Sequence, residues 1–312
     1  MRIGIVTDSA CDLPRAYREQ HGIRILPITL RFGSDYYRDV RDPEDTKAFY
    51  KRFIAEPDVD AETQPLTVDE VADIFLDELV LEYERVLVIT VSSSRSPIFE
   101  NTTKASFKIL KGYRERRAKA GLEGPFALRV MDSQTLFTGE AVLVQEAVRL
   151  LEEEQVPFDQ LRPMIEKLTR HVYAYLVPNS LHHVYHNGRK KGDKSVSWLK
   201  FKLGTMLDVK PVIQMYRGDT GPVASAKGFD AALKDVFGRA RAEIDRGLRT
   251  RTVAMSFAGD PEVIRSRPDF KAFEAHADAA GVQTTLAVMS TTAGINVGPG
   301  AFSLAYISGE SD

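Results

Sequence analysis

Residues 86–96 read VLVITVSSSRS, in which a β-branched, apolar run passes directly into a turn that holds four serines. Such a run is typical of a central strand in a parallel sheet, which is covered on both faces. Residues 3–7 (IGIVT) and 128–131 (LRVM) are similar runs, and a helical segment follows each. Strands that alternate with helices predict crossover connections between parallel strands. The first half of the chain is therefore predicted to be α/β.

Turn and capping residues define further elements of this half. Pro14 and Gly22 flank a predicted helix, and residues 23–30 form a second apolar run that we expect to be one strand. A helix is expected over residues 46–55, followed by an irregular stretch, PDVDAETQPL, at residues 57–66. Thr67 and Glu70 form a capping-box pattern, which predicts a helix that starts there and runs to about residue 80.

The pattern changes after a helix expected around residues 157–171. Two long helices are predicted over residues 229–246 and 261–280, and the predicted strands are residues 172–177, 209–216, 222–226, 252–257, 284–289 and 301–307. Most of these strands lack long crossover connections, so the second sheet is expected to be mixed or antiparallel. We therefore predict two domains, an N-terminal parallel α/β domain of residues 1–170 and a C-terminal α/β domain of residues 171–312.

Composition excludes several functional classes. The 312 residues carry a net charge of -2 and 43% hydrophobic residues, so no overall field would attract nucleic acid or an anionic membrane. A single cysteine, Cys11, excludes an internal disulfide. The longest apolar runs fall far short of the roughly 18 residues that a membrane span needs. We expect a cytoplasmic protein without integral membrane contact or nucleic-acid binding.

Hydroxyl-rich or acidic turns follow three of the predicted parallel strands, and they are Thr7-Asp8-Ser9, residues 92–96 and residues 132–135. Ligands of open α/β sheets bind at the carboxyl ends of the strands, so we expect the three turns to share one edge. Neutral hydroxyls and amides suit one carboxylate or carbonyl better than a polyphosphate. The alternative interpretation is that these side chains only cap helices.

Several catalytic and nucleotide-binding motifs are absent from the sequence. It has no G-x-x-x-x-G-K-[ST], no G-x-G-x-x-G after the first strand and no G-x-S-x-G elbow. His182 and His186 stand one helical turn apart, a spacing that can bind a metal, but neither the H-E-x-x-H glutamate nor an obvious third ligand accompanies them. We expect no metal site and no cofactor.

Residues 189–202 hold six basic residues and one acidic residue. This segment can engage a phosphate or an acidic protein surface, or it can be a solvated basic loop and helix. Near the end of the chain, Gly298 and Gly300 flank Pro299 in a segment that we expect to link two strands as a turn. Glycines there would let a ligand approach the main chain closely.

Together, seven short motifs resemble the DegV family of fatty-acid-binding proteins, and the resemblance covers essentially the whole chain. They are Val6-Thr7-Asp8-Ser9-Ala10, Gln64-Pro65, the Ser-Ser-x-x-Ser turn at residues 92–96, Met131-Asp132-Ser133, Asn187-Gly188-Arg189, LDVKPV at residues 207–212, and Gly298-Pro299-Gly300. Each motif is weak alone, but their shared order and spacing make a chance match improbable.

The resemblance implies two α/β domains that hold a long-chain fatty acid between them. By this analogy the carboxylate contacts are Thr63, Ser93 and Ser96. A family member of this kind carries the acyl chain and presents it to a separate fatty-acid kinase, which phosphorylates the carboxylate. Arg189 matches the arginine of a family motif, and its basic surroundings suggest a surface that faces the kinase or the acyl phosphate.

The sequence departs from the family pattern at several of these places. Glu62 stands where a hydroxyl residue is common, Ile98 lies within an altered Gly-Thr-Tyr, and Asn296 stands where a histidine usually precedes Gly-Pro-Gly. Asn296 can hydrogen-bond a ligand head group, but it cannot titrate as histidine does. The leading hypothesis is a lipid carrier without catalytic residues of its own; the alternative is an enzyme that transfers a phosphoryl or acyl group to or from a small carboxylate or phosphorylated ligand.

Overall fold

The computed structural model describes residues 2–56, 59–190 and 209–309 of the chain. A four-stranded parallel sheet forms the N-terminal core, in the order β2-β1-β6-β7. Its strands are β1 (Ile3–Asp8), β2 (Arg24–Leu26), β6 (Arg85–Thr90) and β7 (Ala127–Asp132). The three runs that the sequence analysis singled out thus lie side by side, and the prediction of a parallel α/β half is confirmed.

A six-stranded mixed sheet forms the core of the C-terminal half, in the order β10-β9-β8-β13-β11-β12. Only the β11 and β12 pair is parallel. Its strands are β8 (Val172–Val177), β9 (Val209–Tyr216), β10 (Asp219–Lys227), β11 (Leu248–Phe257), β12 (Gln283–Val288) and β13 (Phe302–Ser308). The expected mixed sheet is therefore confirmed.

A third, three-stranded antiparallel sheet was not predicted. It has the order β4-β3-β5, with β3 (Ile28–Phe32), β4 (Asp35–Asp39) and β5 (Ala61–Gln64). The run at residues 23–30 is divided at Pro27 between β2 and β3, so the prediction of one strand there was wrong. The proline has no N–H to donate to a ladder and marks the point where the chain leaves one sheet for the other.

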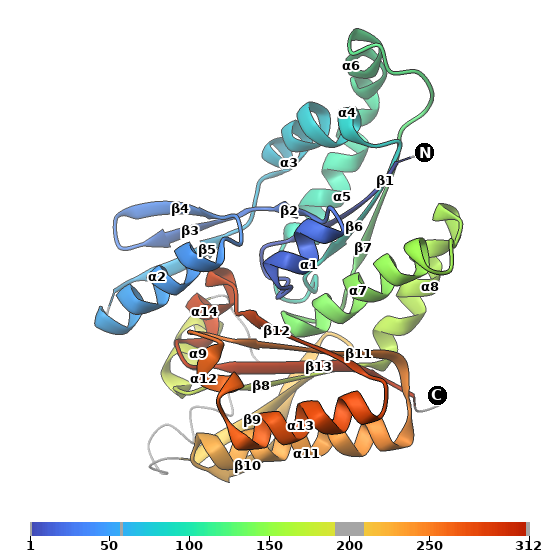
Figure 1. Cartoon of the computed structure of the whole chain (residues 1–312). Helices are drawn as coiled ribbons and strands as arrows, with labels where there is room; N and C mark the ends of the chain where they lie inside the picture. The colour runs from blue at the N-terminus through green and yellow to red at the C-terminus, as the bar shows by residue number, and fades with distance from the viewer. Residues whose placement is uncertain (1, 57–58, 191–208, 310–312) are drawn as a thin grey trace.

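The helices cover the sheets in layers (Figure 1). Those of the N-terminal half are α1 (Arg15–Gln20), α2 (Pro43–Ala55), α3 (Val68–Ile74), α4 (Val80–Glu82), α5 (Ile98–Lys108), α6 (Tyr113–Lys119), α7 (Thr138–Glu152) and α8 (Phe158–Leu168). The others are α9 (Leu181–Lys190), α11 (Phe229–Arg246), α12 (Glu262–Arg265), α13 (Pro268–Ala279) and α14 (Thr291–Val297). A π-helical turn, Phe75–Leu79, joins α3 to α4, and the predicted capping box of Thr67 and Glu70 is confirmed.

Helix α7 lies between the parallel sheet and the mixed sheet (Figure 1), packing against β1 on one side and against β11 and β13 on the other. It is buried on nearly every face, with polar side chains such as Glu140 and Gln145 inside. A helix that is covered all round is expected where two sheets share it. Helices α11 and α13 cover the opposite face of the mixed sheet, where Phe237, Phe270 and Phe273 form part of a separate apolar core.

Candidate functional site

The carboxyl ends of the parallel strands meet at one edge, as predicted. At the end of β1, Asp8 Oδ2 accepts a hydrogen bond of 2.8 Å from the backbone N–H of Val91, which follows β6. Beyond β6, the Ser93 hydroxyl donates to Asp132 Oδ2 at 2.5 Å, and Asp132 ends β7. The Ser92 N–H donates to the Thr135 carbonyl at 3.0 Å. Adjacent parallel strands therefore bring the three polar turns into direct contact.

The two serines predicted to bind a carboxylate differ in their surroundings. Ser93 is exposed, and both its hydroxyl and its backbone N–H donate to Asp132. A hydroxyl has only one hydrogen to donate, and the hydroxyl hydrogen of Ser93 is already bonded to the Asp132 carboxylate. Ser96 is half-buried, and its oxygen accepts a hydrogen bond of 3.3 Å from the Ile98 N–H at the start of α5. Its own hydroxyl hydrogen has no acceptor among the described residues, which makes Ser96 the better placed donor for a ligand.

The serine turn, residues 92–96, touches the mixed sheet of the other half of the chain. Ser94 Oγ donates to the Gly218 carbonyl at 2.9 Å, and Arg95 donates to the Thr220 hydroxyl at 2.6 Å. Gly218 and Arg217 form the two-residue turn between β9 and β10, and both have positive φ, as a type I′ hairpin turn requires. The serine turn therefore lies where the two halves of the chain meet.

Thr63 lies on β5, a strand in a stretch that was predicted to be irregular. The strand alternates between buried Ala61 and Thr63 and exposed Glu62 and Gln64, because successive side chains of a strand point to opposite faces. Glu62 accepts a hydrogen bond of 3.0 Å from Arg31 on its exposed face. The acidic residue that departs from the family pattern is therefore paired, and it faces away from the side on which Thr63 lies.

The chain around Thr63 contacts two helices, which are α5, the helix that follows the serine turn, and α14. Asn101 of α5 donates a hydrogen bond of 2.7 Å to the Leu66 carbonyl, three residues after Thr63. Helix α14 packs against β5, and its Ile295 joins an apolar cluster with Leu30 and Ala61. Asn101 thus connects α5, which follows Ser96, to the chain after Thr63. The packing of α14 on β5 connects the helix of Asn296 to the strand of Thr63.

The segment before Gly-Pro-Gly is a helix rather than a simple link between strands. Ser290 caps α14 by accepting a hydrogen bond from the Ala293 N–H, and the helix ends at Gly298, whose φ is 86°. Asn296 donates to the Thr292 carbonyl of its own helix at 2.7 Å, which leaves its second amide hydrogen for another acceptor. The sequence TTAGINV mixes β-branched residues with a glycine, and so its helix was not recognised.

Helix α9 packs closely against the Gly-Pro-Gly turn. A Cβ on Gly298 would lie 2.4 Å from His183 Cδ2, and one on Gly300 would lie 2.9 Å from the Asn179 side-chain nitrogen. Both glycines have positive φ, so the predicted close approach to the main chain is made here by side chains of the protein itself. Burial, together with His182 and His186, lowers the pKa of His183.

Arg189 lies in the last turn of α9, near Asn187, which donates to the Ile295 carbonyl of α14 at 2.6 Å. The helix continues through Gly188 and ends at Lys190. The side chain of Arg189, and the rest of the basic segment from residue 191 to 202, lie outside the described part of the chain. His182 and His186 stack with ring centroids 5.6 Å apart. Within the described ranges, no group of three acidic, histidine or cysteine side chains is arranged to hold a metal ion.

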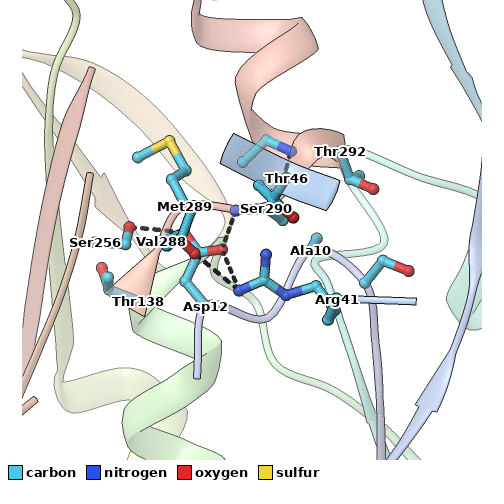
Figure 2. A network of polar contacts seen from close by, with 12 residues as sticks. Ala10, Asp12, Arg41, Thr46, Thr138, Ser256, Val288, Met289, Ser290 and Thr292 are labelled. Carbon is cyan, nitrogen blue, oxygen red and sulfur yellow. Dashed lines mark hydrogen bonds and ion pairs between the residues drawn. The ribbon is translucent and has the colours of Figure 1, made fainter. Parts of the chain in front are cut away.

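A buried polar network, which the sequence analysis missed, joins the two halves behind this region (Figure 2). Asp12 accepts hydrogen bonds from the Ser256 hydroxyl at 2.6 Å and from the Ser290 N–H at 2.8 Å. Arg41 pairs with Asp12 at 3.4 Å and donates to the Val288 carbonyl at 3.1 Å. The Asp12 carboxylate thus binds both the end of β11 and the N-cap of α14. The only signal in the sequence was an acidic residue soon after the first strand.

The carboxylates around this network titrate abnormally. Burial raises the pKa of Asp8 to about 6, against the opposing effect of the Val91 and Ala10 N–H groups. Burial also raises the pKa of Asp12, which Arg41 partly counteracts, and it raises the pKa of Glu140 strongly, with Asp8 adding to the rise. Glu140 accepts a hydrogen bond of 2.5 Å from the Thr7 hydroxyl. Burial penalises the charged form of each of these acids, and this is the main cause of the rise in all three pKa values.

Among the described residues, the donors at the strand edge are mainly hydroxyls and backbone N–H groups, and the guanidinium of Arg95 donates to Thr220. Hydroxyls and N–H groups can orient a carboxylate by hydrogen bonds, whereas a polyphosphate is usually bound by several clustered cations. Among the helices that the structure describes, none is long and apolar enough to cross a membrane.

Known proteins share both the sequence and the fold. A family model described as an uncharacterised protein of the DegV family matches residues 2–309. A DegV domain-containing protein of Xanthomonas axonopodis pv. citri is 40% identical over 306 residues, 98% of this chain and 97% of the relative. The crystal structure of a stearic acid-binding protein from Eubacterium ventriosum superposes with a TM-score of 0.80 at 23% identity, covering 97% of each chain. DegV, a fatty acid binding protein from Bacillus subtilis, gives a TM-score of 0.76 at 20% identity over 99% of each chain.

Proposed function

This chain belongs to the DegV family, and from that premise we propose that it binds one long-chain fatty acid between an N-terminal and a C-terminal domain divided near residue 170. The observation that carries the proposal is the position of the serine turn, which contacts the β9–β10 hairpin of the opposite half through Ser94 and Gly218. The fatty-acid-binding proteins of Eubacterium ventriosum and Bacillus subtilis share the fold over nearly their whole length, which supports the choice of ligand.

The proposed head-group contacts are Ser96, Thr63 and Asn296. Ser96 offers a hydroxyl hydrogen and Asn296 an amide hydrogen, while Thr63 lies on the buried face of β5. Ser93 contributes less to head-group binding in this proposal, because its hydroxyl hydrogen is bonded to Asp132. The proposed set also includes the backbone at Gly298 and Gly300, against which the side chains of His183 and Asn179 pack.

The acyl tail dominates the affinity in this proposal. Each buried methylene contributes about 0.8 kcal/mol, so ten of them supply on the order of 8 kcal/mol before the cost of ordering the ligand. Hydroxyl donors are then needed to orient the carboxylate rather than to supply most of the binding free energy. A neutral donor set serves this purpose, since it does not require a buried cation to be desolvated.

The decisive experiment is mass spectrometry of the purified protein under native and then denaturing conditions, followed by extraction of the released molecule. One fatty acid per chain is the expected result, and it would also give the chain length. A protein that is empty and takes up no added stearate contradicts the proposal. Turnover of a small carboxylate or phosphorylated ligand without any added protein would instead favour the enzyme alternative.

We further propose that the bound carboxylate is presented to a separate fatty-acid kinase and that Arg189 faces this partner. Arg189 lies in the last turn of α9, which packs on α14 and the Gly-Pro-Gly turn beside the proposed head group. The Arg189→Ala variant is expected to keep its fatty-acid affinity and to be phosphorylated more slowly by a cognate kinase. Equal rates of phosphorylation for the variant and the parent protein would reject this role.

A further inference from the structure

Helix α9 is attached to the rest of the protein by few buried contacts. None of residues 181–188 is fully buried, whereas α7 is buried on nearly every face. The helix lies beside α14 (Figure 1), where Asn187 donates to the Ile295 carbonyl, and Val184 packs against the main apolar core. Elements with little buried surface open locally at a lower free energy than core elements, so α9 is expected to open more readily than α7.

The His183 ring connects α9 to the Gly-Pro-Gly turn. It lies so close to Gly298 that a Cβ there would be 2.4 Å from His183 Cδ2. The ring also packs against Phe53 of α2, with ring centroids 5.1 Å apart. Gly298 ends the helix that carries Asn296, one of the proposed head-group contacts. The ring therefore supports a turn that directly follows a proposed contact to the ligand.

A protonated His183 would have further basic residues around it on its own helix. The ring of His182 lies 5.6 Å from that of His183, and His186 stacks on His182. Arg189 and Lys190 follow at the end of the helix. Burial, followed by the charges of the other two histidines, lowers the pKa of His183. The half-buried ring therefore favours its neutral form while α9 stays packed on the turn.

The elements packed against this face of α9 do not compensate for such a charge. Helix α14, Thr291–Val297, has no titratable residue, and the Gly-Pro-Gly turn has none either. Lys210 of β9 adds a cation just before α9 begins, and Arg52 of α2 already pairs with Asp35 and Glu56. Within the described residues, no acid forms an ion pair with a histidine of α9, so the protonated ring would lie here without a counter-ion.

The direction of the pH effect follows from these contacts. While α9 is packed on the turn, the pKa of His183 is lowered, whereas a ring released into water titrates near its ordinary value of 6.5. The released state therefore binds more protons as the pH falls through about 6.5, and its population rises. The packed arrangement of α9 is fully favoured only above this pH.

We propose that His183 is a positioning residue for the fatty-acid head group, and that its protonation releases α9 from the Gly-Pro-Gly turn and weakens fatty-acid binding. This inference rests on the fatty-acid binding proposed above and assigns a pH dependence to the same site. The ring acts through the turn and α14, which carries Asn296, and not by touching the ligand. Neutral pH favours the loaded protein, and mildly acidic pH favours release.

Displacement of a fluorescent fatty acid by stearate tests the proposal at about pH 7.5 and about pH 5.5, on either side of the ordinary histidine pKa. Because stearate itself also titrates, each variant is compared with the parent by the ratio of its affinities at the two pH values. His183→Gln stays neutral, and its ratio is expected to be smaller than that of the parent by about threefold or more. His183→Lys is charged at both pH values and should bind weakly at both. His276→Gln in α13, on the far side of the mixed sheet, is the matched control and should keep the ratio of the parent.

Hydrogen–deuterium exchange of the ligand-free protein measures the release of α9 by itself. The exchange times are scaled for the intrinsic pH dependence of amide exchange, and α11 serves as the internal reference. In the parent, the protection of α9 relative to α11 is expected to fall at the lower pH. In His183→Gln it is expected to stay the same.

The proposal is overturned if the parent and His183→Gln show equal ratios of stearate affinity, or if α9 of the parent keeps its protection at the lower pH. It is also overturned if His276→Gln lowers the ratio as much as His183→Gln does, because the effect would then not be specific to α9. If the protein takes up no stearate at either pH, the proposed function fails by itself. The exchange measurement, which needs neither ligand nor variant, then decides separately whether acid releases α9.

Discussion

The Ser256 hydroxyl donates a hydrogen bond of 2.6 Å to Asp12 across 244 positions of the sequence, and both residues are fully buried. Asp12 follows the first strand of the parallel sheet, whereas Ser256 belongs to β11 of the mixed sheet. Asp12 also accepts a hydrogen bond from the backbone N–H of Ser290, which is the N-cap residue of α14. The start of the helix that precedes the Gly-Pro-Gly turn is therefore held by carboxylates of the opposite half of the chain, because Asp39 also accepts hydrogen bonds from the N–H and the hydroxyl of Thr292.

Replacing this carboxylate is expected to destabilise the protein strongly. In the Asp12→Ala variant, Arg41 loses its ionic partner while it stays buried, and such a change costs about 3–5 kcal/mol. Urea denaturation followed by circular dichroism measures the free energy of unfolding. Glu19→Ala, which removes an exposed ion pair with Arg15, is the control and should cost less than about 1 kcal/mol. Similar losses for the two variants would show that the Asp12 network contributes little.

Asp8 is expected to make the protein less stable as the pH rises from about 4 to about 6. Its pKa is raised from 3.8 to about 6 in the folded state, so the folded protein binds more protons than the unfolded chain in this range. The stabilisation is complete below the unfolded pKa and is lost as the pH passes the folded one. The shift corresponds to about 3 kcal/mol in all.

The Asp8→Asn variant tests this, because asparagine does not titrate. It is expected to be less stable overall, since an amide offers one acceptor oxygen to the two N–H groups that Asp8 now binds. Its free energy of unfolding should nevertheless depend less on pH between 4 and 6 than that of the parent. If the free energy of unfolding changed equally with pH in the two proteins across this range, Asp8 would not be the cause of the pH dependence.

Ser96 and Ser93 are expected to contribute unequally to fatty-acid affinity. Ser96→Ala removes a hydroxyl whose hydrogen has no acceptor within the described part of the chain, and it should weaken binding by about 1–3 kcal/mol. Ser93→Ala removes a hydroxyl that donates to Asp132, so a smaller effect on affinity is expected. Displacement of a fluorescent fatty acid measures both variants under one condition. Unchanged affinity of Ser96→Ala would remove Ser96 from the site.

The elements that sequence patterns predicted are those whose signals are local. The apolar run at residues 86–91 and the capping box of Thr67 and Glu70 each specify their own conformation. Strand β5 has the sequence AETQ, and β4 has DYYRD, and neither carries a long apolar run. These two strands form because β3 pairs with both, which is a tertiary contact that propensity does not contain.

The same distinction applies to the site. The shared edge of the three polar turns followed from parallel strand order, because neighbouring parallel strands end together. The bond from Ser256 to Asp12 could not be predicted, since it depends on how two separately formed sheets pack about α7. Likewise, the exposed direction of Glu62 became evident only when β5 fixed which residues face the interior.

Gly298→Ala is expected to destabilise the protein and to displace His183. The backbone there has a φ of 86° and a ψ of 160°, a region essentially restricted to glycine, which costs another residue about 1–3 kcal/mol. A methyl group would also lie 2.4 Å from His183 Cδ2, so the ring must move. Burial is the main cause of the lowered pKa of His183, and a ring pushed toward solvent should titrate closer to its ordinary value of 6.5.

Nuclear magnetic resonance of the histidine ring protons follows this pKa directly, and thermal denaturation measures the loss of stability. Gly238→Ala in α11 is the matched control, because its backbone is helical and, apart from its chain neighbours and its own helix backbone, no atom of the described residues lies within 4 Å of its Cβ position. That substitution should stabilise the protein by about 0.5–1 kcal/mol, since alanine is the better helix former. If Gly298→Ala left both the stability and the pKa of His183 unchanged, the packing of α9 on the Gly-Pro-Gly turn would not constrain this glycine. A rise in the pKa together with weaker fatty-acid binding would instead connect the position of α9 to the proposed head-group site.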